Sequence, residues 1–372
     1  MKFAAILVIQ LLLCAALIWV GRFTALASLG QQVALFRETT ALGDVPDDEM
    51  RPGDELVYED ATAEQIRAYT WTSPHVMTPF VGHGPEPGAT GTVITNNEQC
   101  RSKRQVRMPK PADRIRIFAT GGSTLWGAGA SDNDHTITGY LERMLNEDPN
   151  RPEDKRYEVF AFANPAWAST HERIVIENRI SEFDPDLVIS FSGLNDVHWA
   201  FVGRNVLWFR SYADQVYFEV MNEVLTRTGY EPVLDVAPSS PTPLAPDLIV
   251  HRLTKNAQLA THSLSPSGIP YLFCLQPTML VSGKPLSPRE NEDLDEIEEP
   301  RQAYHRYAFD AIADRLAAVE LPGFHFADLT GVFDSDRESD QVFLDPYHFG
   351  DIGNERIARR LFDLVRPILA GR

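Results

Sequence analysis

From residue 114 onward, apolar positions fall into two alternating kinds of segment. Five short apolar runs have the length of a strand and are predicted as strands: residues 115–120, 157–162, 187–191, 269–275 and 324–329. Four longer segments carry apolar residues at intervals of three and four and are predicted as helices: residues 136–146, 170–183, 301–319 and 351–369. Strands that alternate with helices of this length form βαβ units. The pattern therefore predicts an α/β fold, a three-layer sandwich with a central parallel sheet.

The amino-terminal end of the chain has a different pattern. Residues 3–20 are almost wholly apolar, a length that fits both a membrane-spanning anchor and the core of a signal peptide. The pair Ala25 and Ala27 fits a signal peptidase site, whereas Arg22 and the long apolar run favour an uncleaved anchor. We therefore predict that residues 1–27 are a membrane anchor or a signal peptide, and that the rest of the chain lies outside the cytoplasm.

The remaining chain divides into a lead-in and a folded domain. Residues 28–110 are acidic at first and then rich in Gly and Pro, and we interpret them as an acidic stalk and an irregular lead-in. The βα pattern lies in the predicted domain, 111–372. Within it, the interval of about 197–267 is too long for a simple crossover and is predicted to be an insertion. A second stretch, 282–300, is rich in Glu and Asp and is predicted to be a solvated loop.

Composition and charge exclude several classes of partner. The chain has 372 residues, 44% of them hydrophobic and 23% charged, which is typical of a folded globular protein. Its 34 Lys and Arg against 52 Asp and Glu give a net charge of −18. Because nucleic acids are bound through an excess of basic residues, this balance excludes a nucleic-acid partner. It equally disfavours docking on anionic lipid through a polybasic face.

Cysteine usage leaves two alternatives and predicts no metal site. Of the three cysteines, Cys14 lies in the apolar amino-terminal segment. Cys100 and Cys274 form one disulfide in an oxidising compartment or remain buried free thiols, and the strand-like run around Cys274 favours the second alternative. The sequence has no Cys-x-x-Cys pair and no close His/Cys cluster. A structural zinc site is therefore not predicted.

The first predicted strand is followed by Gly121-Gly122-Ser123-Thr124. Glycines at this point allow a sharp turn, in which a Ser hydroxyl and its own N–H face one point. A phosphate-binding loop is the main alternative for a glycine-rich turn between strand and helix. It is excluded because no Lys follows Gly127 and because the Gly-x-Gly-x-x-Gly spacing is absent.

Two further motifs fall at the same predicted edge of the sheet. The third strand is followed by Gly193-Leu194-Asn195-Asp196, which is either a plain turn or a way to aim the Asn195 amide at a developing oxyanion. Near the carboxyl terminus, Asp345 stands three residues before His348. A carboxylate at this spacing can bind the imidazole Nδ1 and leave Nε2 as a general base. Parallel sheets place their active sites at the carboxyl ends of the strands, so we expect the three motifs to meet there.

In this order, over roughly residues 115–369, the motifs resemble those of the SGNH, or GDSL-like, hydrolase superfamily. The Gly-Gly-Ser-Thr first block is the form associated with exported or membrane-anchored bacterial members. The resemblance implies a flavodoxin-like SGNH hydrolase fold, with Ser123 as the nucleophile, His348 as the base and Asp345 as the acid of a catalytic triad. It also implies that Asn195 and the N–H of Ser123 line the oxyanion hole.

The second block of the superfamily differs in this chain. Members place a Gly after the second strand, and its N–H completes the oxyanion hole, but residues 163–169 (Ala-Asn-Pro-Ala-Trp-Ala-Ser) contain no Gly. A backbone donor can survive replacement of Gly by Ala where the backbone angles permit it. Ala168 is therefore our candidate for the third donor, with Ser169 next to it as the alternative.

The resemblance implies an exported serine esterase that cleaves carbohydrate O-acetyl groups or lipid esters. The resemblance also implies that the esterase needs no metal and no organic cofactor. Two alternatives remain open at this point: an O-acyltransferase that modifies an envelope or exported polysaccharide, and a non-catalytic binding domain on the same fold. The expected location is the periplasm or cell surface, with the membrane as a partner through the amino-terminal segment, or secretion if that segment is cleaved.

Overall fold

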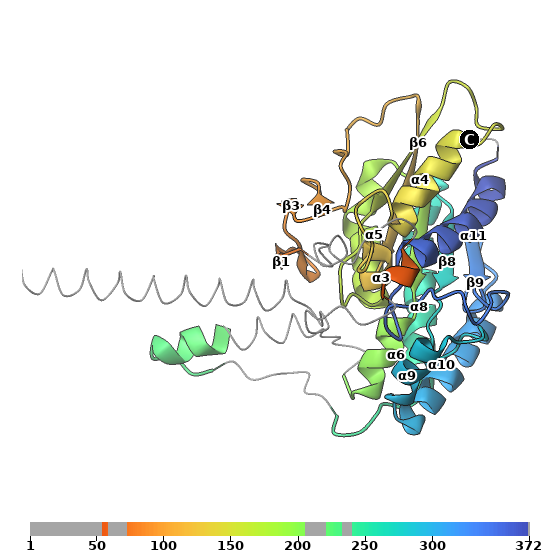
Figure 1. Ribbon diagram of the computed structural model, residues 1–372. Helices are drawn as coiled ribbons and strands as arrows, with labels where there is room; N and C mark the ends of the chain where they lie inside the picture. The colour runs from red at the N-terminus through yellow and green to blue at the C-terminus, as the bar shows by residue number, and fades with distance from the viewer. Residues whose placement is uncertain (1–53, 59–72, 205–220, 233–239, 371–372) are drawn as a thin grey trace, which may run out of the picture.

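The computed structural model describes residues 54–58, 73–204, 221–232 and 240–370 (Figure 1). The predicted anchor or signal peptide, residues 1–27, lies outside this part of the chain. In the described ranges, no helix combines the length and the hydropathy needed to span a membrane.

A five-stranded parallel sheet forms the centre of the molecule. Its strands, at the predicted positions with small shifts at their ends, are β5 (Arg114–Gly121), β6 (Arg156–Ala161), β7 (Leu187–Ser192), β8 (Tyr271–Leu275) and β9 (Phe324–Asp328). The spatial order is β6-β5-β7-β8-β9. This is the flavodoxin-like order, in which the chain leaves the neighbouring strands β5 and β7 in opposite directions. Ligands of such sheets bind at that point, outside the carboxyl ends of the strands.

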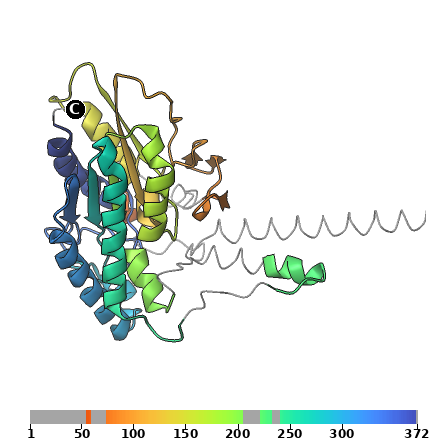
Figure 2. The same ribbon diagram turned by 180° about the vertical axis from the view of Figure 1, so that it is seen from behind.

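Helices cover both faces of the sheet (Figures 1 and 2). One layer contains α4 (Ile137–Glu147) and α11 (Asp351–Leu369), which pack against each other. The other layer contains α5 (Ser169–Asn178), α8 (Pro246–Leu264) and α10 (Glu299–Ala317). The predicted three-layer α/β sandwich is confirmed.

The side chains of each strand alternate between two hydrophobic cores. In β5, Ile117 and Ala119 belong to the core under α4 and α11, whereas Phe118 belongs to the core under α5, α8 and α10. Because both faces of the sheet are covered, the strands are apolar without interruption. This is why short continuous apolar runs identified them in the sequence.

The predicted insertion at 197–267 includes a regular crossover helix that the sequence interpretation missed. Helix α6 (Leu194–Phe201) follows β7, and α8 then carries the chain back to β8. The inner face of α8 has apolar residues at helical spacing but also buries Thr254, Asn256 and Thr261. These buried polar positions weaken the apolar periodicity on which the prediction depended.

The prediction that residues 282–300 form a solvated loop is wrong. The segment contains α9 (Pro288–Asp295), which starts with a capping box between Ser287 and Glu290. Glu290 and Asp293 are buried. Acidic composition indicated solvent exposure, but the Glu290 carboxylate is paired with Lys284 of the same segment and also accepts the N–H groups of residues 342 and 343.

The lead-in before residue 111 is only partly irregular. It contains two antiparallel hairpins: β1 (His75–Thr78) with β2 (Gly82–Pro85), and β3 (Gly88–Thr90) with β4 (Val93–Thr95). The buried Arg101 guanidinium donates to the carbonyls of Trp126 (3.1 Å) and Gly127 (2.7 Å), in the turn that follows the first sequence motif. The described lead-in is therefore packed against the α/β domain.

Cys100 and Cys274 are free, buried thiols. They belong to cores on opposite faces of the sheet. Burial raises the pKa of both thiols above the ordinary value. Of the two alternatives that the sequence left open, the structure shows the buried free thiols.

Candidate active site

The first motif forms a tight turn between β5 and α3 (Ser123–Trp126). Gly122 has a φ of −84°, which is open to other residues, so backbone conformation does not explain the glycines. The close approach of neighbouring atoms explains why both positions are glycine. A Cβ on Gly121 would lie 2.5 Å from the Phe191 carbonyl oxygen, and one on Gly122 would lie 2.3 Å from Asn195 Nδ2. The glycines therefore allow the Ser123 turn to pack directly against β7 and Asn195.

Asp345 organises the loop that carries His348. The loop is closed by the bridge between Phe343 and Phe349 and by the hydrogen bond from Leu344 N–H to His348 O, 2.9 Å. Asp345 Oδ1 accepts the N–H of Tyr347 at 2.7 Å and the N–H of His348 at 2.9 Å. One carboxylate oxygen thus fixes the loop backbone and leaves the other oxygen for the imidazole.

Ser123, His348 and Asp345 form a continuous hydrogen-bonded chain. Asp345 Oδ2 lies 2.7 Å from His348 Nδ1, and His348 Nε2 lies 2.7 Å from Ser123 Oγ. Nδ1–H donates to the carboxylate in this arrangement, so Nε2 is the nitrogen that can accept the serine proton. The side chains of His348 and Asp345 are 17% and 18% exposed, so these hydrogen-bonded side chains are partly accessible to a substrate.

The electrostatics keep Asp345 ionised. Burial by itself would raise the pKa of the carboxyl. The charge and hydrogen bond of His348 and the two backbone N–H groups outweigh that effect and lower the pKa below its ordinary value. Asp345 therefore remains a carboxylate that can stabilise an imidazolium at His348.

Asn195 lies beside the Ser123 turn. It is the second residue of α6, which begins after Gly193 at a φ of +118°. A Cβ on Gly193 would also lie 2.5 Å from Leu275 Cδ1, so both space and conformation require glycine there. Asn195 Nδ2 donates to the Trp167 carbonyl at 2.6 Å, and the amide packs against Gly122. The structure thus brings Asn195 together with Ser123, His348 and Asp345.

The N–H of Ala168, the candidate third oxyanion donor, is engaged elsewhere. It donates to His171 Nδ1 at 3.2 Å, and the N–H of the alternative, Ser169, donates to Asp196 Oδ2 at 2.9 Å. The residue with a left-handed backbone in this block is Ala166, at a φ of +67°. The structure therefore does not bring a free Ala168 N–H to Ser123, because the capping contacts of α5 use it.

Two buried carboxyl groups near Asn195, those of Asp196 and Glu172, were not predicted as part of the site. Asp196 accepts the hydroxyl of Ser169 as well as its N–H, and Glu172 is hydrogen-bonded to Ser192. Burial is the main cause that raises the pKa of Asp196 to about 6 and that of Glu172 to about 8. The two carboxyls tie α5 to β7 and α6. Asp196, the last residue of the Gly193-Leu194-Asn195-Asp196 motif, was the available sequence signal, whereas Glu172 had none.

Replacing Glu172 by Gln is expected to flatten the pH dependence of stability. Folded Glu172 keeps its proton up to about pH 8, whereas the unfolded chain loses it near the ordinary value of 4.5. The free energy of unfolding therefore falls as pH rises through this window. Urea unfolding at pH 6 and pH 8 should show a smaller fall for Glu172→Gln than for the wild type. The exposed Glu182→Gln is the control, and an equal fall in all three proteins would contradict the assignment.

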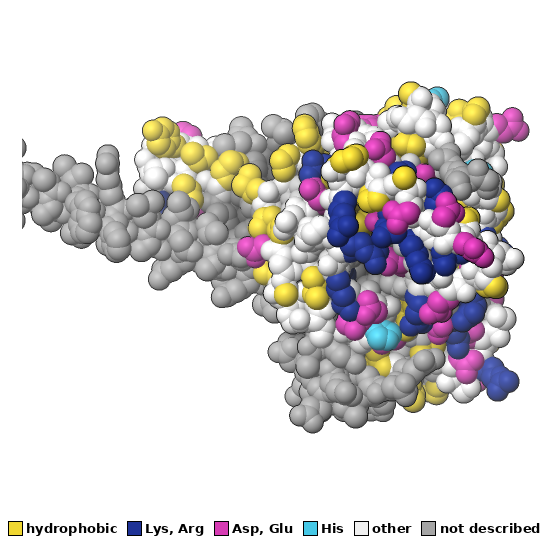
Figure 3. Space-filling model, turned by 90° about the horizontal axis from the view of Figure 1, so that it is seen from above, with side chains coloured by type: hydrophobic (Ala, Val, Ile, Leu, Met, Phe, Trp, Pro, Cys, Tyr) yellow, Lys and Arg dark blue, Asp and Glu magenta, His cyan; other side chains and the backbone are white. Residues whose placement is uncertain are grey.

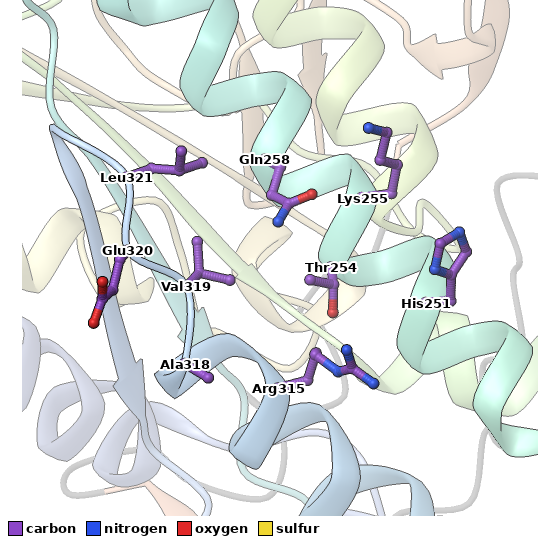
Figure 4. Close-up of a pocket in the computed structure, with 9 residues that line it drawn as sticks. All are labelled: His251, Thr254, Lys255, Gln258, Arg315, Ala318, Val319, Glu320 and Leu321. Atoms are coloured by element: carbon purple, nitrogen blue, oxygen red, sulfur yellow. The ribbon is translucent and has the colours of Figure 1, made fainter.

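A cavity of about 360 Å³ lies apart from these residues, between α8 and the carboxyl-terminal end of α10 (Figure 4). Its lining residues are His251, Thr254, Lys255, Gln258, Arg315, Ala318, Val319, Glu320 and Leu321. None of the predicted site residues contributes to it. In the described part of the chain, no three His, Cys, Asp or Glu side chains are grouped so that they could hold a metal ion.

Comparisons with known proteins give matches among solved structures alone. No protein-family model matches the sequence, and no curated protein matches it. A lipase from a goat rumen metagenome is 14% identical, with a TM-score of 0.41 over 66% of this chain and 95% of that one. An acetyl xylan esterase is 15% identical, with a TM-score of 0.42 over 68% of this chain and 100% of that one. A Bacteroides ovatus protein described as a GDSL-like lipase is 13% identical, with a TM-score of 0.38 over 72% and 56% of the two chains.

Proposed function

We propose that this chain is an exported serine esterase. The observation that carries the proposal is the hydrogen-bonded chain from Asp345 through His348 to Ser123, whose members lie up to 225 residues apart in the sequence. The position of these residues in the sheet supports the proposal further. Ser123 follows β5 and Asn195 follows β7, the neighbouring strands that the chain leaves in opposite directions.

The geometry supports acyl transfer in two steps. Ser123 Oγ attacks the ester carbonyl while His348 Nε2 takes its proton, and Asp345 stabilises the resulting imidazolium. The N–H of Ser123 and the second N–H of the Asn195 amide stabilise the tetrahedral oxyanion. His348 then gives its proton to the leaving alcohol. Water attacks the acyl-enzyme with His348 again as the base, which releases the acid and restores Ser123.

Substrate class and location are part of the same proposal. Carbohydrate O-acetyl groups or lipid esters are the substrates implied by the superfamily that the motifs resemble. The apolar segment at residues 3–20 supports export, with retention at the membrane where the segment is not cleaved.

Covalent labelling tests the proposal directly. A fluorophosphonate probe phosphonylates an activated serine and releases fluoride, so the wild-type protein should carry the label at Ser123, located by peptide mass spectrometry. Ser123→Ala should not be labelled. The control is Ser181→Ala, which changes a serine of the short helix η2 (Ile180–Phe183) and should be labelled as the wild type is. Label on another residue, or no label on the folded wild type, would contradict the proposal.

A further inference from the structure

Arg301, in the first turn of α10, connects two parts of the candidate active site. Its Nη2 donates to His198 Nδ1 at 2.8 Å and to the Tyr347 hydroxyl at 2.5 Å. His198 lies one turn after Asn195 on α6, and Tyr347 immediately precedes His348. The guanidinium therefore lies between the helix of the oxyanion donor and the loop of the base.

The charge of Arg301 has no acidic partner among the residues that the structure describes. On the face in Figure 3, Lys and Arg are interspersed with Asp and Glu. The partners of Arg301 are neutral: burial, followed by the charge of Arg301, lowers the pKa of His198 to about 3. Aromatic rings flank the guanidinium carbon, with the Phe201 centroid at 5.8 Å and the Tyr347 centroid at 5.7 Å.

These contacts leave part of the guanidinium unused. Both side-chain hydrogen bonds that Arg301 makes in the described part of the chain involve Nη2, and neither involves Nη1. A hydrogen-bonding link between α6 and the loop needs no charge, since a neutral amide can donate in the same way. An uncompensated guanidinium is well suited to a further anionic oxygen group, which it can bind through charge-assisted hydrogen bonds.

The direction of proton transfer places the alcohol part of the ester on this side of the site. His348 Nε2 must deliver its proton to the leaving oxygen, so the alcohol has to lie next to the His348 loop. Tyr347 belongs to that loop and holds Arg301. An anionic group on the alcohol is therefore nearer to Arg301 than one on the acyl group.

We propose that Arg301 is a specificity-determining residue that binds a carboxylate or phosphate on the alcohol part of the substrate. The enzyme then prefers esters whose alcohol part carries an anionic group, such as O-acetylated sugars with a carboxylate or phosphate. The inference rests on the proposed esterase function, and it names the substrate class of the same site.

The test compares two acetyl esters of similar shape: 4-acetoxybenzoate, whose leaving group carries a carboxylate, and the neutral 4-acetoxybenzamide. Each variant is compared with the wild type on the same ester, so the different reactivities of the two leaving groups cancel. Arg301→Gln should lower kcat/KM for the anionic ester by about 10- to 100-fold, mainly through KM, and leave the neutral ester within about twofold. Arg301→Lys keeps the charge but loses the planar pair of guanidinium donors. Its kcat/KM for the anionic ester should lie between the values of the wild type and Arg301→Gln. The control is Arg306→Gln, since Arg306 lies on the same helix, is exposed and pairs with Glu299.

Other outcomes separate failure of this inference from failure of the esterase proposal. An equal loss on both esters would show a positioning contact alone, and no loss on either would show no role, so both results would overturn the anion site. If the wild type has no Ser123-dependent turnover, the esterase proposal fails, and calorimetry with 4-hydroxybenzoate decides the anion site. Binding that Arg301→Gln removes and Arg306→Gln keeps would support the site, whereas absence of such binding would overturn it.

Discussion

Ser123→Ala is expected to lower kcat for 4-nitrophenyl acetate by about 10⁵- to 10⁶-fold, with little change in KM. The reason is that Ser123 Oγ lies 2.7 Å from His348 Nε2, the nitrogen that takes its proton. Loss of the hydroxyl removes the acyl-enzyme route, and the slow residual reaction depends on binding and the oxyanion donors. Initial-rate kinetics measure the effect, with Ser181→Ala as the matched control.

A double variant sharpens this prediction. His348→Ala should reduce kcat about as strongly as Ser123→Ala, because the base has no function without the nucleophile and the nucleophile is weak without the base. The two effects should therefore not multiply, and the double variant should be no slower than either single variant. Turnover retained in Ser123→Ala, or losses that multiply in the double variant, would show that the two residues do not act as one unit.

The second large effect is expected for stability. Glu290→Ala should lower the free energy of unfolding by about 3–5 kcal/mol, because it leaves the buried Lys284 ammonium without its partner. The Lys284 and Glu290 side chains are fully buried, and the Nζ to Oε2 distance is 2.6 Å. The other oxygen, Oε1, accepts the N–H groups of Val342 (3.1 Å) and Phe343 (3.2 Å), just before the Asp345 loop.

Urea unfolding measures this loss, and Glu292→Ala provides the control. Glu292 lies on the same helix but is exposed, so its replacement should change stability by less than about 0.5 kcal/mol. Equal stability of the two variants would mean that the ion pair and the contacts to residues 342–343 do not hold the carboxyl-terminal loop. The expected difference distinguishes a buried structural carboxylate from the solvated surface that acidic composition suggested.

The strands and most helices could be predicted because their signal is local. Buried strands in a sheet covered on both sides are continuous apolar runs, and α11 is strongly amphipathic along its length. Helix α8 was missed because it buries polar side chains, among them Asn256, which donates to Ser169 and Thr170. Those acceptors are more than 80 residues away, so no local pattern could identify them.

The amino-acid sequence by itself determined the order of the elements and the chemistry at the strand ends. Each motif is a few residues long, and the parallel sheet brings the carboxyl ends of its strands to one edge, which is enough to predict that Ser123 and Asn195 meet. His348 lies well beyond the end of β9, and the resemblance to the superfamily is what joined it to them. Which other groups join them is a matter of tertiary structure. Glu290 accepts the N–H groups of Val342 and Phe343, and Arg301 reaches His198 and Tyr347. A group's environment depends on the acceptors and charges around it, and in both cases the chain supplies these from segments that are distant in sequence.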